Sequence, residues 1–318
     1  MSVLDISVVV PLYNEEESLP ELVDWINRVM EENRYSFEVI LVDDGSTDRS
    51  WEVVENLSKT RSYIRGISFL RNYGKSAALY AGFESAEGNV VITMDADLQD
   101  NPNEIPDLYR MITEDKYDLV SGWKQKRYDP IGKRLPSKFF NATARFVSGI
   151  KLNDFNCGLK AYRRRVVKSI EVYGEMHRYI PVLAKQAGFK NIGEKVVEHQ
   201  ARKYGVTKFG WERFIHGFLD LLSVMFVSKF GKKPMHFFGS LGIITFLIGG
   251  ILSCYMIGEK IYCLSNHLKV REVVDQPLFY ISLTLVIIGA QLFLTGFLGE
   301  LVSRSSSERN SYHVDKKI

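Results

Sequence analysis

The stretch Val90-Val91-Ile92-Thr93-Met94-Asp95-Ala96-Asp97 decides the fold class of this 318-residue chain. Its first five residues are mostly apolar without polar alternation, which predicts a buried central strand of a parallel sheet. Ligands of such sheets bind beyond the carboxyl ends of the strands. Asp95 and Asp97 lie two residues apart, so on an extended chain their carboxylates point the same way. Two hard oxygen ligands predict a site for Mg²⁺ or Mn²⁺, and an acidic turn without a ligand is the alternative.

The residues on both sides of this stretch alternate between strand and helix patterns. Apolar runs predict strands at 6–10, 37–42 and 64–70, and helices are predicted at 16–32, 49–59 and 75–85. The alternation predicts an α/β fold with a mostly parallel, Rossmann-like sheet and helices on both faces. Polar clusters follow four of the strands, at 11–15, 43–48, 71–75 and 95–100. The sheet is therefore expected to gather these clusters at one edge.

Two uncharged stretches, 237–258 and 278–299, stand out from an average composition with 25% charged residues and a net charge of +3. Each has about the 20 residues needed to cross a bilayer, so two transmembrane helices are predicted. A pair of buried helices in a soluble core is the alternative. The small net charge gives no reason to predict a nucleic-acid partner.

The charged residues flanking these stretches predict the orientation of the chain in a bacterial inner membrane. Lysines at 229, 232 and 233 precede the first stretch, and Arg304, Arg309, Lys316 and Lys317 follow the second. This bias places both termini in the cytoplasm. The amphipathic segment 211–226 predicts a helix in the membrane interface, or one docked on the soluble domain. The expected domains are 1–208, 209–233, 234–303 and a basic tail, 304–318.

The three cysteines, Cys157, Cys254 and Cys263, show no metal-ligand spacing and are expected to be free thiols.

The ordered set of motifs at 10–15, 43–48, 71–75, 95–100, 153–160 and 202–208 resembles the family 2 glycosyltransferases of the GT-A fold. Within that family the chain is most similar to the polyprenyl-phosphate hexose transferases, such as dolichyl-phosphate mannose synthase, bactoprenol glucosyltransferase and the aminoarabinose transferase. The resemblance covers about residues 5 to 210, and the two-helix tail is similar to the bactoprenol branch.

The resemblance implies a nucleotide-sugar site beside a metal. The residues implied to bind the nucleotide sugar are Pro11, Tyr13, Asn14, Glu15, Asp43, Asp44, Arg71, Lys75, Asp95 and Ala96. Those implied to hold Mg²⁺ or Mn²⁺ are Asp95, Asp97 and Gln99, where the metal would neutralise the leaving diphosphate. For Arg71 and Lys75, a structural salt bridge to the domain's own acidic groups is the alternative.

The acceptor is expected to be a lipid phosphate. Basic residues crowd the stretch 124–138, and Arg and Lys side chains with a hydroxyl are the usual phosphate receptors. The resemblance favours Arg134, Ser137, Lys138, Arg202 and Lys208 for this site. A basic face attracted to anionic lipid headgroups is the alternative.

Asp154 matches the position of the candidate base in related transferases, and together with Asp97 it is predicted to be catalytic. A phosphate monoester with a second pKa near 6 is already largely dianionic in the cytoplasm, so it needs positioning more than deprotonation. Asp154 is therefore alternatively expected to orient a sugar hydroxyl or a basic partner.

These features predict transfer of one hexose, with inversion, from a nucleotide sugar to undecaprenyl phosphate. Processive relatives carry a Gln-x-x-Arg-Trp element, whereas the corresponding stretch 200–204 has no Trp. UDP-glucose is the first donor predicted, with GDP-mannose, a UDP-N-acetylhexosamine and a UDP-aminopentose as alternatives. A non-catalytic nucleotide- or lipid-binding scaffold and a protein-directed transferase are the other hypotheses. Gly239, Gly242, Gly249 and Gly250 would permit the close helix contacts of a homo-oligomer, dimer or tetramer.

Overall fold

Strand β4 (Val90–Thr93) lies in the middle of an eight-stranded sheet, as its apolar sequence predicts. In this computed structural model the described residues are 4–125, 141–142, 144–145, 148–174, 176–200, 203, 234–268, 271–305 and 314–317. The chain forms two units, one of residues 1–225 with 309–318 and one of residues 226–308. The predicted domain boundaries at 208 and 233 stay predictions, because residues 204–233 lie outside the described ranges.

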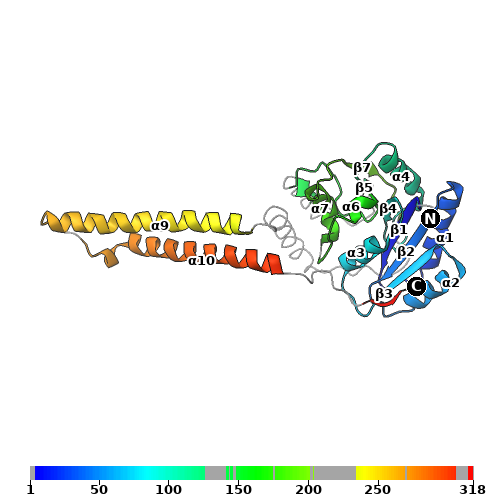
Figure 1. The fold of residues 1–318 in the computed structure, drawn as a ribbon, viewed down its shortest axis with the longest axis horizontal. Coiled ribbons are helices and arrows are strands. Elements are labelled where there is room, and N and C mark those ends of the chain that lie inside the picture. The colour runs from blue at the N-terminus through cyan, green and yellow to red at the C-terminus, as the bar shows by residue number, and fades with distance from the viewer. Residues whose placement is uncertain are drawn as a thin grey trace. The chain divides into compact units, whose positions relative to one another are not determined.

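The sheet has the strand order β7-β5-β6-β4-β1-β2-β3-β8 (Figure 1). The strands are β1 (Ile6–Leu12), β2 (Phe37–Asp43), β3 (Ile64–Phe69), β4, β5 (Leu119–Trp123), β6 (Lys160–Arg163), β7 (Ile192–Val196) and β8 (Val314–Lys317). Strands β1 to β4 pair in parallel, and β6 runs antiparallel between β4 and β5. The predicted α/β fold with a mostly parallel sheet is confirmed.

Helices cover both faces of the sheet, which explains why its strands lack polar alternation. The longer helices of this unit are α1 (Leu19–Glu32), α2 (Ser50–Thr60), α3 (Lys75–Ser85), α4 (Ile105–Thr113) and α7 (Ile180–Gln186). The short ones are α6 (Arg164–Val167), η1 (Pro102–Glu104) and η2 (Met176–Tyr179). Val8 and Val10 belong to the core that includes α1, whereas Val9 touches Gly82 of α3 on the other face.

Helix α1 begins at Leu19, three residues after the predicted start. The backbone N–H of Ser18 donates to the Glu15 carbonyl at 3.2 Å, so a turn precedes the helix. Pro20 then occupies the first helical turn, where its missing N–H costs no hydrogen bond. The predicted apolar face of this helix is fully buried.

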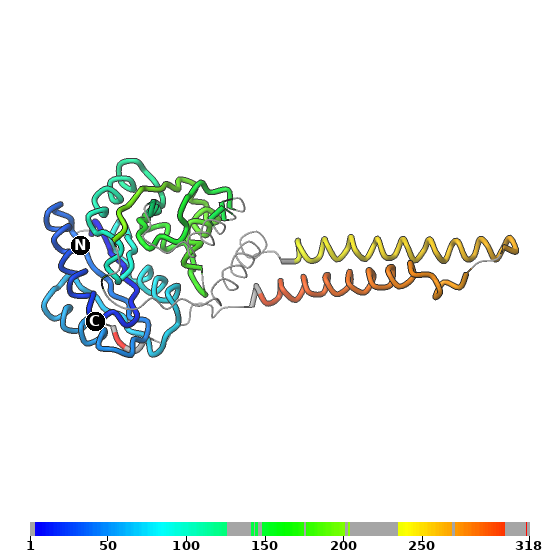
Figure 2. The backbone as a smooth tube through the Cα atoms, turned by 180° about the vertical axis from the view of Figure 1, so that it is seen from behind, coloured from blue at the N-terminus to red at the C-terminus, as the bar shows by residue number. Residues whose placement is uncertain are grey.

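Strand β8 covers the outer edge of the sheet by pairing antiparallel with β3. In the view from behind, the short red segment near the C-terminus lies within the first unit (Figure 2). Lys316 also forms an ion pair with Glu55 of α2 at 3.4 Å. An unpaired edge strand is a template for unwanted pairing, so β8 protects β3. Part of the predicted tail is therefore a component of the first unit's sheet.

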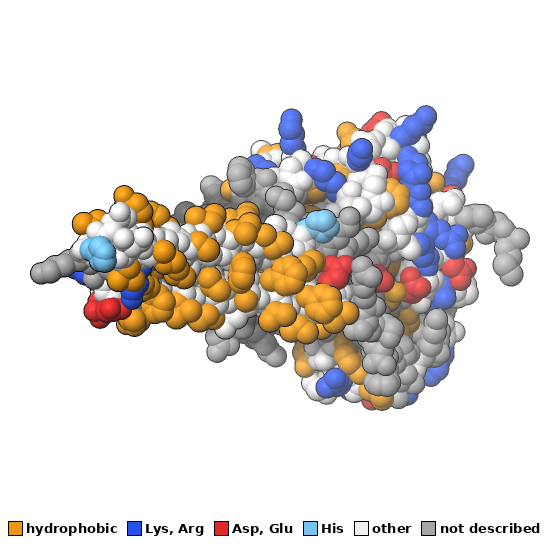
Figure 3. All heavy atoms as spheres, turned by 60° about the vertical axis from the view of Figure 1, so that its left-hand side comes forward, with side chains coloured by type: hydrophobic (Ala, Val, Ile, Leu, Met, Phe, Trp, Pro, Cys, Tyr) orange, Lys and Arg blue, Asp and Glu red, His pale blue; other side chains and the backbone are white. Residues whose placement is uncertain are grey.

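The second unit is a hairpin of α9 (Pro234–Ser265) and α10 (Pro277–Ser305), with η3 (Val273–Asp275) in the connection. Met235–Ser265 and Pro277–Val302 are long and apolar enough to cross a membrane, with mean hydropathies of 2.0 and 2.1. Hydrophobic side chains cover the visible surface of the hairpin (Figure 3). Both predicted spans lie within these helices.

Glycines let the two helices of the hairpin approach closely. A Cβ on Gly242 would lie 2.7 Å from the Gly289 carbonyl oxygen, and one on Gly249 would lie 2.7 Å from the Ser282 oxygen. Gly239 similarly approaches Gly296. These three glycines thus form the contact between α9 and α10 within one chain, whereas nothing lies within 4 Å of the position that a Cβ on Gly250 would occupy.

Candidate functional site

A cleft of about 340 Å³ opens at the carboxyl ends of β1, β2 and β4. Eight of the predicted site residues line it, namely Pro11, Tyr13, Glu15, Asp44, Lys75, Asp95, Ala96 and Asp97. They come from all four polar clusters that follow the strands, and Lys75 is also the first residue of α3. The expected gathering of these clusters at one edge of the sheet is therefore observed.

Asp44 binds the backbone of the third cluster. Its carboxylate accepts hydrogen bonds from the N–H of Tyr73 at 2.7 Å and of Gly74 at 2.9 Å. Gly74 has φ +94°, a conformation that favours glycine and aims its N–H at this carboxylate. Burial raises the pKa of Asp44 to about 6, and these two hydrogen bonds oppose the rise.

We expect Asp44→Asn to change how stability depends on pH. The raised pKa means that the folded protein holds this proton more tightly than the unfolded chain does, so Asp44 lowers stability as pH rises from about 4 to about 6. The amide that replaces the carboxylate would keep an oxygen acceptor but would not titrate. The difference in free energy of unfolding between the variant and wild type should therefore shift in favour of the variant by up to about 3 kcal/mol between pH 4 and 7. Denaturant titrations at several pH values would measure this gain, with Asp24→Asn on the exposed side of α1 as the control.

Asn14 and Asp43 are not among the residues that line the cleft. The Asn14 side chain accepts from the Thr47 N–H at 2.8 Å, which ties the first polar cluster to the second. Asp43 is buried and accepts from the backbone and hydroxyl of Ser46. Both residues hold the loops that form the cleft, and their predicted contact with the nucleotide sugar stays a prediction.

Lys75 and Asp95 form an ion pair, the structural alternative that the sequence left open for this lysine. Burial alone would raise the pKa of Asp95, but Lys75 and Lys124 hold it well below its usual range. The carboxylate is thus ionised and suited to a cation. Arg71, the other basic residue of this cluster, is exposed and lies 4.8 Å above the ring of Tyr73.

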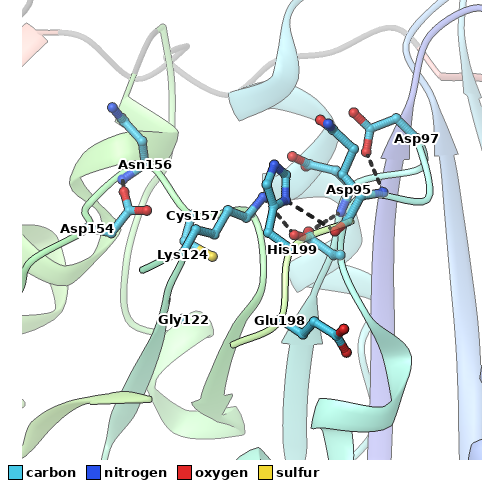
Figure 4. Close-up of polar contacts among 12 residues, drawn as sticks. Asp95, Asp97, Gly122, Lys124, Asp154, Asn156, Cys157, Glu198 and His199 are labelled. Carbon is cyan, nitrogen blue, oxygen red and sulfur yellow. Dashed lines mark hydrogen bonds and ion pairs between the residues drawn. The ribbon is translucent and has the colours of Figure 1, made fainter. Parts of the chain in front are cut away.

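The acidic segment after β4 is tightly folded. The Asp97 carboxylate accepts from the Gln99 N–H at 3.2 Å, and the buried Asp100 pairs with Lys124 at 2.9 Å. His199, which the sequence analysis did not single out, lies beside this segment with its Nδ1 3.2 Å from the Gln99 carbonyl oxygen (Figure 4). Among the described residues there is no group of three or more acidic, His or Cys side chains ready to hold a metal.

The residues present nevertheless fit a metal that also binds the substrate. Asp95 and Asp97 both line the cleft, and two carboxylates leave positions for phosphate oxygens and water, as Mg²⁺ and Mn²⁺ prefer. The Gln99 side chain is not among the groups that line the cleft, so its predicted part in metal binding stays a prediction.

Gly158 leaves the space that the Asp95 side chain fills. A Cβ on Gly158 would lie 2.6 Å from the Asp95 carboxyl carbon, closer than such atoms approach.

The neighbouring Cys157 is buried, which raises the pKa of its thiol to about 12 and makes it unreactive. The predicted free thiols are confirmed for all three cysteines.

A narrower pocket continues from the cleft past Lys75 and Asp95. Its basic lining residues include Lys160, His177 and Arg178, which the sequence analysis had not assigned to the site. Burial lowers the pKa of Lys160, and burial with nearby cations lowers that of His177. Lys160 ends the motif 153–160 but was given no role there, whereas His177 and Arg178 lie outside all the motifs, which explains why motif spacing did not find these two.

Asp154 is buried but lines neither pocket. One carboxylate oxygen accepts from the Asn156 N–H at 3.0 Å, and Figure 4 shows the side chain directed toward Asn156. Asn156 itself lines the narrower pocket. The catalytic role of Asp154 stays a prediction.

The predicted acceptor site lies outside the described residues, as does the amphipathic segment 211–226. The residues of the acceptor site are Arg134, Ser137, Lys138, Arg202 and Lys208.

The mostly parallel sheet, with its cleft and acidic pair at the carboxyl ends of the strands, places the first unit in the GT-A class of folds. Residues 7–171 match the model of glycosyl transferase family 2. The chain belongs to glycosyltransferase family 2 and is an enzyme of that family, as the motifs predicted.

The relatives and solved structures agree with this assignment. Dodecaprenyl-phosphate galacturonate synthase of Rhizobium johnstonii is 36% identical over 95% of this chain and 88% of its own length. Undecaprenyl-phosphate 4-deoxy-4-formamido-L-arabinose transferase of Pectobacterium carotovorum is 34% identical over 99% of this chain and 94% of its own length. Glucosyl-3-phosphoglycerate synthase of Mycobacterium tuberculosis, with Mn²⁺, UDP-glucose and phosphoglyceric acid, shares the fold at a TM-score of 0.54 and 20% identity. That match covers 71% of this chain and 79% of the solved one.

Proposed function

We propose that this protein transfers one sugar from a uridine diphosphate sugar to a polyprenyl phosphate at a membrane. The observation that carries the proposal is the cleft in which Asp44, Asp95 and Asp97 meet, in a chain that matches polyprenyl-phosphate transferases over nearly its whole length. The hairpin of two apolar helices supports a membrane location. The inner membrane and cytoplasmic termini belong to this proposal on the charge bias of the flanks.

The relatives favour a donor other than the predicted UDP-glucose. Their names specify galacturonate and a 4-formamido derivative of L-arabinose. The pyranose rings of these two sugars have the same configuration, with an axial substituent at C4. They differ in that substituent, which is a hydroxyl or a formamido group, and at C5, where galacturonate carries a carboxylate. We therefore propose a donor sugar of galacto configuration.

Among such sugars, galacturonate best suits the basic side chains that line the narrower pocket. That pocket has a volume of only about 10 Å³, so the sugar ring would lie in the larger cleft with its carboxylate directed toward these side chains. Lys160, His177 and Arg178 line the narrower pocket, and Arg178 forms no ion pair or hydrogen bond with any residue that the structure describes. A guanidinium is suited to bidentate contact with a carboxylate. UDP-galacturonate is the first choice, and the formamido-pentose donor is the second.

The reaction is a displacement at the anomeric carbon. A phosphate oxygen of the lipid forms the new bond to C1 as the bond from C1 to the diphosphate oxygen breaks, and UDP leaves with the electron pair. Attack from the opposite face inverts the anomeric centre. A cation held by Asp95 and Asp97 would offset the charge that develops on the diphosphate.

The chain's own residues would position this reaction. Asp44 and the turn at Pro11–Glu15 are assigned to the uridine, and Lys75 is assigned to the diphosphate. The ion pair between Lys75 and Asp95 must weaken before Lys75 can contact the diphosphate. Since the acceptor is already anionic, proximity and charge contribute more than proton removal. Asp154 is accordingly proposed to orient the sugar or a basic partner.

A transfer assay with purified full-length protein, undecaprenyl phosphate and Mn²⁺ tests the proposal. Label from UDP-galacturonate should enter the organic-extractable lipid, and EDTA should abolish the transfer. UDP-galactose, UDP-glucose, GDP-mannose, UDP-N-acetylglucosamine and the UDP-formamido-pentose complete the donor panel. Arg178→Gln should reduce the preference for UDP-galacturonate over UDP-galactose about tenfold or more. Binding of UDP without transfer from any donor would favour the scaffold hypothesis, and label in protein would favour a protein acceptor.

A further inference from the structure

Gln291 places an amide near the middle of the apolar helix α10. An α-helix rises 1.5 Å per residue, so Gln291 lies about 2 Å along the helix axis from the midpoint of the span Pro277–Val302. The Gln291 side chain is exposed on the hairpin and forms no hydrogen bond with any residue that the structure describes. Within hydrocarbon, an amide without a partner is unfavourable, because no water is present to replace the missing hydrogen bonds.

The side of α10 opposite Gln291 is the one that packs on α9. Gly289 and Gly296 make the close contacts with that helix. Successive residues of an α-helix are 100° apart, so Gln291 points about 200° away from Gly289. The partner that satisfies its amide must therefore come from outside the hairpin.

Gln291 belongs to a continuous row of exposed side chains, here called the Gln291 stripe. It consists of Thr284, Ile288, Gln291, Thr295, Leu298 and Val302, all exposed. Their spacings of four, three, four, three and four residues match the seam of two helices that wind around each other. The hydroxyl groups of Thr284 and Thr295 donate to backbone oxygens of their own helix, so only the Gln291 amide needs a partner.

We propose that the Gln291 stripe packs against the same stripe of a second copy of this chain. Two copies inserted with the same topology are parallel in the membrane, so a two-fold axis along the membrane normal brings each residue opposite its own equivalent. A carboxamide is both donor and acceptor, and two Gln291 side chains can therefore satisfy each other. The inference rests on the proposed membrane location of the hairpin and is independent of the donor sugar.

Cysteine cross-linking of the full-length protein in native membranes tests this contact. With Cys254 and Cys263 replaced by Ser, Thr284→Cys and Thr295→Cys should give disulfide-linked dimers on mild oxidation. Leu283→Cys and Leu294→Cys are the matched controls, because these exposed neighbours point about 100° away. Equal cross-linking at all four positions, or none at 284 and 295, would overturn the proposal, as would a cross-link to a protein of different mass.

The strength of self-association provides a second test. In detergent, Gln291→Leu should weaken dimerisation of the full-length protein about 3- to 30-fold, while Gln291→Asn should retain most of it. Sedimentation velocity over a concentration series measures both, and an unchanged constant for Gln291→Leu would contradict the role of the amide. Carbonate extraction separates the premise from the proposal: release from the membrane refutes the membrane location, whereas retained protein that does not cross-link refutes only the stripe.

Discussion

Asp97→Asn is expected to lower the rate of sugar transfer about a thousandfold, which corresponds to about 4 kcal/mol of transition-state stabilisation. The substitution keeps the shape of the side chain and the oxygen that accepts from the Gln99 N–H, so the segment after β4 should keep its fold. It removes one of the two carboxylate charges that the cleft offers to a cation. Transfer of labelled sugar at saturating donor measures the loss, and Mn²⁺ titration followed by electron paramagnetic resonance should show weaker metal binding.

Asp24→Asn is the matched control for this experiment. It makes the same kind of charge loss on α1, where Asp24 pairs with Arg61 at 2.6 Å and is largely exposed. It should transfer sugar at the wild-type rate. If Asp97→Asn kept both its rate and its Mn²⁺ affinity, the acidic segment would be a structural turn, as the alternative sequence interpretation holds.

Gly158→Ala is expected to lower transfer about a hundredfold although it replaces no charged residue. The added methyl group would lie 2.6 Å from the carboxyl carbon of Asp95, so this side chain has to move. Displacing a positioned group by about 1 Å costs on the order of a hundredfold in rate. The loss should appear in the transfer rate and in Mn²⁺ affinity, while binding of uridine, which involves the other end of the cleft, should change little.

Gly250→Ala makes the same chemical change where nothing lies within 4 Å of the new methyl group, and transfer should be unaffected. Asp95→Ala provides a second comparison, because the double variant with Gly158→Ala should be no worse than Asp95→Ala alone. Additive losses would show that Gly158 acts on something other than Asp95.

Much of the fold could be predicted because its signals are local. The apolar runs of β1, β2 and β4 identify strands buried on both faces, and the uncharged stretches identify α9 and α10. Strands β5, β6, β7 and β8 were not predicted. All four are short, and each is formed by pairing with a strand far away in the chain.

The candidate site could be predicted in outline but not in its detailed contacts. Eight of the predicted residues line the cleft, because parallel strands bring the segments after them to one edge. The same motifs also contain Asn14 and Asp43, whose side chains hold the loops in place. Composition alone does not separate these two roles, since the same polar side chains suit both turns and ligands.

The amino-acid sequence thus determined the class of fold, the acidic pair after β4 and the apolar helices, because each depends on residues that are neighbours in the chain. The tertiary structure decided that Lys75 pairs with Asp95, that Gly158 makes room for that carboxylate, and that β8 closes the edge of the sheet. It also decided that Gln291 lies opposite the face of α10 that packs on α9. These relations join residues far apart in the chain, and only the packing of the folded chain brings such residues into contact or turns them away from each other.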